Sequence, residues 1–157
     1  MHKIHWLKLL ASIALAEAVG GLSALLSGDI SAVYRSLILP PLAPPGWLFP
    51  LVWTLLFAMM GVAAYLVGQA PVSADERRSA WRWYAAQLLV NMSWPVVFFR
   101  FQLWGWALAV LIVLIVLVIV TTVKFARIKR LAGYLLLPYL LWLLFAAYLN
   151  LGVVILN

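Results

Sequence analysis

Five segments of about 20 largely apolar residues determine what this chain can fold into. An α-helix of that length crosses the hydrocarbon core of a bilayer. Of the 157 residues, 68% are hydrophobic and 10% are charged. A soluble domain is closer to about half apolar and about a quarter charged, so lipid must surround this chain. The segments predict an all-α, five-helix transmembrane bundle, one domain over residues 1–157, with helices at about 6–26, 47–68, 81–100, 104–124 and 132–155.

Basic residues are distributed unequally between the two ends of these helices. Two of them, Arg35 and Arg100, fall on the side away from the N-terminus. Nine fall on the side of the N-terminus: Lys3, Lys8, Arg77, Arg78, Arg82, Lys124, Arg127, Lys129 and Arg130. The positive-inside rule then places the N-terminus in the cytoplasm and the C-terminus outside. This topology accounts for the net charge of +7, and we expect no nucleic-acid partner.

The nine tryptophans divide into two groups by their depth in the predicted helices. Six lie near helix ends, as expected for anchors at the headgroup level: Trp6, Trp47, Trp81, Trp83, Trp104 and Trp106. The other three lie between the outer interface and the midplane: Trp53, Trp94 and Trp142. Helical spacing places further residues beside these three, namely Phe57, Met60, Gln87, Asn91, Ala146 and Asn150. Together they predict an aromatic-lined cavity, and interhelical hydrogen bonding by the amides is the alternative.

The first predicted helix carries two further signals. Small residues recur at every fourth position, which permits close approach of another helix of the same chain or of a second copy: Ser12, Ala16, Gly20 and Ala24. Glu17 is the only acid within a predicted helix, and we expect it to face the bundle interior. It is either a functional carboxylate or a structural group bonded to Asn91 or Gln87. The chain has no cysteine, we expect no metal site, and His2 and His5 are expected to be solvated.

The connection before the second predicted helix is both apolar and rich in proline. Residues 39–53 read LPPLAPPGWLFPLVW. Proline fixes φ and keeps the preceding residue extended, so this segment is stiff. Pro44 and Pro45 lead into Gly46 and Trp47, where the helix is predicted to begin. The segment is either a lid over a site for a flat hydrophobic ligand or a loop lying on the headgroups.

Several strings in order along the chain resemble the TspO/MBR family, which comprises bacterial tryptophan-rich sensory proteins and the mitochondrial translocator protein. They are YRSL, PPLAPPGWLFPLVWTLLFAMMGVAAYLV, WYAAQLLVNMSWPVVFF, GWAL with a later TT, and LLLPYLLWLLFAAYLN, within residues 34–150. The resemblance implies a five-helix bundle, usually a homodimer. It also implies binding of tetrapyrroles such as protoporphyrin IX and haem, of sterols and of benzodiazepine-type compounds, without an obligatory cofactor.

The resemblance assigns residues to the ligand pocket by their motifs. Trp53 of VWT and Trp142 of PYLLW match tryptophans linked to porphyrin binding and its light-dependent breakdown. Asn91, Trp94 and Ala146 match other pocket positions. Two features depart from the family pattern. Leu42 stands where many members have a loop tryptophan, and the tail NLGVVILN lacks the aromatic and basic residues of the mitochondrial sterol motif.

These observations favour a receptor or sensor that binds tetrapyrroles and regulates their levels or transport. One alternative is an enzyme that degrades porphyrin with light and oxygen, in which Trp53 and Trp142 would act. The third is a small transporter, for which no inverted repeat is visible. We expect a multi-pass protein of a bacterial cell membrane.

Overall fold

Helices make up all the regular secondary structure of residues 4–157, the part of the chain that this computed structural model describes. Lys3 and His2 lie outside the described residues. The elements are α1 (Trp6–Leu26), α2 (Ile30–Ser36), α3 (Leu48–Gln69), α4 (Ala74–Pro95), the π-helical turn η1 (Val96–Arg100), α5 (Trp104–Ile128) and α6 (Arg130–Leu156). The predicted all-α class is confirmed.

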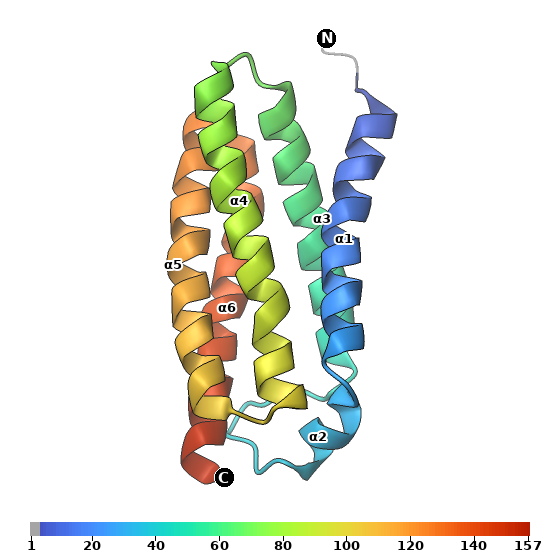
Figure 1. The fold of residues 1–157 in the computed structure, drawn as a ribbon, viewed down its shortest axis with the longest axis vertical. Helices are drawn as coiled ribbons and strands as arrows, with labels where there is room; N and C mark the ends of the chain where they lie inside the picture. Colours follow the sequence, from blue (N-terminus) through green and yellow to red (C-terminus); the bar gives the residue numbers. More distant parts are fainter. Residues whose placement is uncertain (1–3) are drawn as a thin grey trace.

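The five long helices form a closed ring in which sequence neighbours are not always spatial neighbours. α1 packs against α3 and α4, α3 packs against α6, α6 against α5, and α5 against α4. The start of α1 lies at one end of the bundle, called the N-terminal end, and the C-terminus lies at the other (Figure 1). The α3–α4 and α5–α6 connections share the N-terminal end, whereas α2 lies across the opposite end (Figure 1).

Four of the described helices are long and apolar enough to cross a membrane, namely α1, α3, α5 and α6. The remaining long helix, α4, begins at Ala74 rather than at residue 81 as predicted. Its start is fixed by a capping box in which Ser73 and Glu76 each accept a hydrogen bond from the other's backbone N–H. The charged first turns of α4 therefore extend beyond the apolar segment from which its span was predicted.

The helix α2 was not predicted, because it lies in a connection too short for a span. Gly28 adopts a φ of 76°, which glycine tolerates, and this turns the chain out of α1. Asp29 then caps α2, its Oδ1 accepting a hydrogen bond from the Ala32 N–H at 2.9 Å. The turn and the cap place α2 across the end of the bundle, beside the proline-rich segment.

Small residues let α1 and α3 approach until their backbones touch. The Ser12 hydroxyl donates to the Gly61 carbonyl at 2.7 Å, and a Cβ added at Gly61 would lie 2.5 Å from the Ile13 Cα. A Cβ added at Gly20 would lie 2.5 Å from the Phe57 ring. These small residues therefore serve packing within one chain, whereas Ala24 is exposed.

Glu17 does not lie in the bundle interior as expected. Its neighbour Ala16 is fully buried, and one residue along a helix is a rotation of about 100°, so Glu17 lies on the flank of α1. Its side chain is half-buried and has no hydrogen-bond partner among residues 4–157, neither Asn91 nor Gln87.

Candidate functional site

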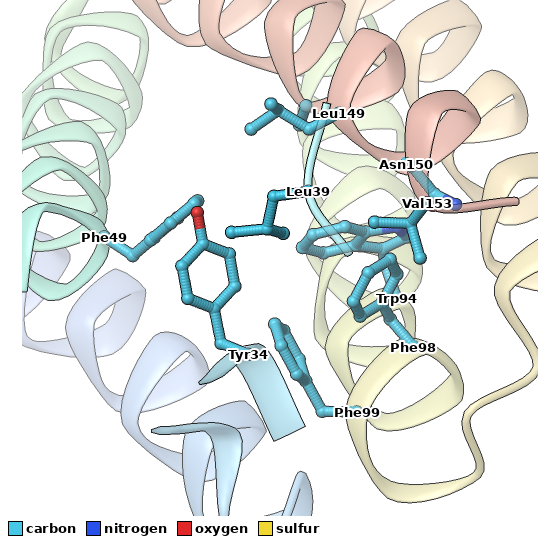
Figure 2. A pocket seen from close by; sticks show the side chains of 10 residues that line it. Tyr34, Leu39, Phe49, Trp94, Phe98, Phe99, Leu149, Asn150 and Val153 are labelled. Atoms are coloured by element: carbon cyan, nitrogen blue, oxygen red, sulfur yellow. The ribbon is translucent and has the colours of Figure 1, made fainter. Parts of the chain in front are cut away.

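A small apolar cavity lies inside the end of the bundle that α2 and the proline-rich segment cover. Its volume is about 30 Å³. Figure 2 shows aromatic and aliphatic side chains converging on it from α2, the connection, α3, the α4–η1 junction and α6. The lining residues are Tyr34, Leu39, Phe49, Trp94, Phe98, Phe99, Ala146, Leu149, Asn150 and Val153.

The indole of Trp94 is held in place by Asn150. The Trp94 Nε1–H donates to the Asn150 Oδ1 at 3.1 Å, and the Asn150 Nδ2 donates to the Trp104 carbonyl at 2.9 Å. The Phe98 and Phe99 rings lie with their centroids 5.4 and 6.3 Å from that of Trp94. One buried amide thus orients the largest aromatic side chain of the cavity wall and joins α4, α5 and α6.

The connection of residues 37–47, called the lid below, is fastened to the bundle at several points. The Tyr34 hydroxyl donates to the Pro44 carbonyl at 2.6 Å, and the Tyr148 hydroxyl donates to the Pro41 carbonyl at 2.8 Å. Burial raises the pKa of the Tyr34 phenol above its ordinary value, so the hydroxyl remains a donor across the neutral range. Pro44, one of the predicted site residues, is thus a fastening point of the lid.

The C-terminal turns of α6 supply the other fastenings of the lid. The Asn157 amide accepts from the Ile38 N–H at 3.0 Å and donates to the Ile38 carbonyl at 2.9 Å. Gly152 forms a notch for Pro40, since a Cβ added at Gly152 would lie 2.5 Å from the proline ring. The proline-rich segment is therefore seated on α6, across the end of the bundle that holds the cavity.

Leu42 lies at the tip of the lid and does not face the cavity. Its side chain is 83% exposed, and its φ of 67° is strained for a residue with a Cβ. In this conformation, a tryptophan at the position of Leu42 would lie outside the cavity. The presence of leucine instead of tryptophan at position 42 therefore removes no wall of the closed cavity.

Trp53, Phe57 and Trp142 form an aromatic layer beside the cavity rather than its lining. The Trp142 and Phe49 ring centroids are 5.9 Å apart, and Phe49 lines the cavity. The Trp53 ring lies 5.8 Å from that of Phe57 and 6.2 Å from that of Tyr139. The Trp142 Nε1 is buried and has no hydrogen-bond acceptor within residues 4–157. A polar donor is thus available in otherwise apolar surroundings.

Gln87 and Asn91 lie in the interior and bond to protein groups, as the alternative interpretation of these amides anticipated. The Asn91 Nδ2 donates to the Tyr139 hydroxyl at 2.6 Å, and that hydroxyl donates to the Gln87 Oε1 at 2.8 Å. The Gln87 Nε2 faces the Met60 sulfur at 3.7 Å. This buried network joins α3, α4 and α6 on the side of the cavity that faces the centre of the bundle.

The structure brings three predicted site residues into one cavity wall, namely Trp94, Ala146 and Asn150. Pro44 and Pro45 lie in the lid, with the Pro45 carbonyl accepting from the Leu48 N–H. Phe98 was missed although it follows Trp94 by four residues, which places it on the same side of a helix. Phe99, five residues after Trp94, lies in the π-helical turn η1 and was also missed. Trp104 is not a simple interfacial anchor, because its Nε1 is buried. Trp83 is also half-buried, whereas the other four predicted anchors are exposed: Trp6, Trp47, Trp81 and Trp106.

Comparison with known proteins agrees with this architecture. Residues 12–156 match the TspO/MBR family. The chain is 38% identical to the tryptophan-rich protein TspO of Chlorobaculum tepidum, over 79% of this chain and 78% of the relative. It is 38% identical to the tryptophan-rich sensory protein of Cereibacter sphaeroides, over 97% and 92%. It is 36% identical to the translocator protein of Homo sapiens, over 74% and 70%.

Proposed function

The chain is a multi-pass membrane protein that belongs to the TspO/MBR family, and from this premise we propose that it is a receptor for tetrapyrroles such as protoporphyrin IX. The ligand would enter beneath the lid and lie against Trp94, Phe49 and Trp142. Binding there would regulate the level or transport of the tetrapyrrole in the membrane.

The observation that carries this proposal is the unpaired indole N–H of Trp142. A buried donor without an acceptor is costly, and such groups are rare in folded proteins. The Trp142 ring packs against that of Phe49, which is a wall of the cavity, so one side chain separates the indole from the cavity. A flat aromatic ligand that carries carboxylates or ring nitrogens could stack on these rings and accept this hydrogen bond.

The closed cavity is too small for such a ligand. Its volume of about 30 Å³ is far below the roughly 300 Å³ or more of typical small-molecule sites. Binding would therefore displace the lid, whose attachments are a few hydrogen bonds, the contact between Pro40 and Gly152, and the packing of Leu37 and Leu39 against the core. Lid opening would merge the cavity with the aromatic layer of Trp53 and Trp142.

Metal-free protoporphyrin IX is the appropriate first probe, because stacking on aromatic rings involves the macrocycle and needs no central metal. The cavity lining contains one residue of a type that can ligate a haem iron, Tyr34, whose hydroxyl donates to the Pro44 carbonyl.

The test is a titration of purified protein with protoporphyrin IX in detergent, followed by tryptophan quenching and porphyrin absorbance. It is done in the dark, because light-dependent degradation would consume the ligand. We expect Trp142→Ala and Trp53→Ala to weaken binding roughly tenfold or more. Trp142→Phe should lose less, because it retains a ring and lacks only the donor and part of the area.

The matched control is Trp106→Phe, at the same end of the bundle, where the side chain is 71% exposed. It should bind like the parent. The site would lie elsewhere if both alanine variants bound protoporphyrin IX with the affinity of the parent while Trp106→Phe bound it more weakly.

A further inference from the structure

A second hollow lies at the opposite end of the bundle, where α5 passes into α6. It is an open groove of about 320 Å³, lined by Val123, Ala126, Arg127, Arg130 and Tyr134. This is the end that also holds the start of α1 and the α3–α4 connection (Figure 1). The groove is therefore distant from the cavity under the lid, and its chemistry differs because two guanidinium groups border it.

Small residues explain why the groove is hollow. A Cβ added at Gly133 would lie 2.5 Å from the Ala126 Cβ, so α5 and α6 are in direct contact there. Neither residue has a side chain long enough to fill the space in front of this contact. The longer side chains of Arg127, Arg130 and Tyr134 border the hollow instead, and all three are exposed.

The two groove arginines have no partner among residues 4–157, neither a carboxylate nor a hydrogen-bond acceptor. Three other cations at this end do have partners, whereas the side chains of Lys8, Arg82 and Lys129 have none among residues 4–157. The Lys124 ammonium donates to the Ser79 hydroxyl at 3.0 Å, Arg77 donates to the Ala70 carbonyl at 2.7 Å, and Arg78 lies 3.7 Å from Asp75. No Asp or Glu occurs anywhere from residue 101 to residue 157, so α5 and α6 provide no counter-charge.

We propose that this groove binds the phosphate headgroup of an anionic phospholipid from the adjacent leaflet. Guanidinium groups offer paired donors that match phosphate oxygens, and the exposed Tyr134 hydroxyl is a further donor. Basic pockets between helices at the membrane surface are suited to such headgroups. The inference is independent of the tetrapyrrole proposal, because no residue is shared between the two sites.

The apolar part of the groove favours a lipid over a free phosphate. Val123 lies one turn before Arg127 on α5, toward the centre of the bundle, and its side chain is exposed. A phospholipid could place its phosphate between the arginines and its acyl chain along Val123 and Ala126. A free inorganic phosphate would use only the charged half of the groove.

The experiment compares fluorescent phosphatidylglycerol with fluorescent phosphatidylcholine, titrated into purified protein in a neutral detergent. The parent should prefer phosphatidylglycerol. Arg127→Gln and Arg130→Gln should each weaken its binding about fivefold, since one basic residue near an anionic surface contributes about that factor. Arg127→Lys should retain part of the affinity, because it keeps the charge and loses the paired donors.

The matched control is Arg82→Gln, which removes an exposed and unpaired cation of the same end outside the groove. It should bind phosphatidylglycerol like the parent. Equal loss in Arg82→Gln would show attraction by general surface charge and overturn the proposal, as would the absence of any preference in the parent. Displacement of the lipid by an equal concentration of inorganic phosphate would assign the groove to a soluble anion and also overturn it.

Discussion

Gly61 is the residue at which a single added methyl group should do the most damage. Its missing side chain lets α3 touch the backbone of α1 at Ile13, and backbone cannot move aside as a flexible side chain can. We expect Gly61→Ala to push α1 and α3 apart and to destabilise the protein by about 1–3 kcal/mol. Thermal unfolding in detergent measures the effect.

The control for this prediction is Gly21→Ala on α1, where nothing lies within 4 Å of an added Cβ. This variant should match or slightly exceed the parent, because alanine favours the helix. Equal unfolding temperatures for Gly61→Ala and the parent would mean that the two helices are not closely packed.

The Tyr139 hydroxyl is the centre of the buried network that joins α4 and α6. Tyr139→Phe would leave the Asn91 amide without its acceptor and the Gln87 carbonyl without its donor. The expected destabilisation is about 1–3 kcal/mol, the cost of unpaired buried polar groups. Tyr134→Phe, on the same helix at an exposed position, should unfold like the parent in lipid-free detergent. Equal effects of the two substitutions would contradict the assigned network.

At the scale of elements, the lid should control how fast a ligand enters. Tyr148→Phe removes one of its hydrogen bonds, to Pro41, and should lower the stability of the closed lid by about 0.5–1.5 kcal/mol. The association rate of protoporphyrin IX should then rise roughly two- to tenfold in stopped-flow tryptophan quenching. Tyr134→Phe at the far end of α6 should leave the rate unchanged. An unchanged rate for Tyr148→Phe would mean that the ligand enters by another route.

The sequence was sufficient for the elements that local composition determines. α1 occupies the predicted residues 6–26, and the all-α bundle follows from the length and apolarity of the spans. The start of α4 was wrong because hydropathy cannot detect a helix that continues into water, whereas the Ser73 and Glu76 capping box could have indicated it. α2 was missed since seven residues carry too little periodicity.

The candidate site was predictable only where one helix face contained it. Three residues of the cavity wall could be predicted, because helical spacing places them on buried faces: Trp94, Ala146 and Asn150. Tyr34 and Leu39 were missed because their place depends on how the lid seats on α6. That seating depends on contacts between residues more than 100 positions apart, such as Ile38 with Asn157.

For the whole molecule, the predicted orientation can be tested directly because the chain has no native cysteine. Ser31→Cys places a thiol on α2, at the end predicted to lie outside, and Ala74→Cys places one at the start of α4, at the opposite end. Both positions are exposed. In intact cells, or in spheroplasts where an outer membrane intervenes, an impermeant maleimide should label Ser31→Cys alone.

Permeabilisation should then allow Ala74→Cys to react to the same extent. The reverse pattern would invert the topology predicted from the basic residues, and it would place the arginine groove in the outer leaflet. Labelling of both positions in intact cells would show a mixture of orientations.

The order of helices around the ring has a consequence for biogenesis. α3 is enclosed by α1, which the ribosome makes before it, and by α6, which the ribosome makes after α4 and α5. Until α6 enters the bilayer, one side of α3 has no protein neighbour. The lid then has no Gly152 notch, and the cavity lacks the wall that α6 provides. A nascent chain in which α6 has not yet entered the bilayer therefore cannot hold a ligand in this cavity, so ligand binding there would report that α6 has been inserted.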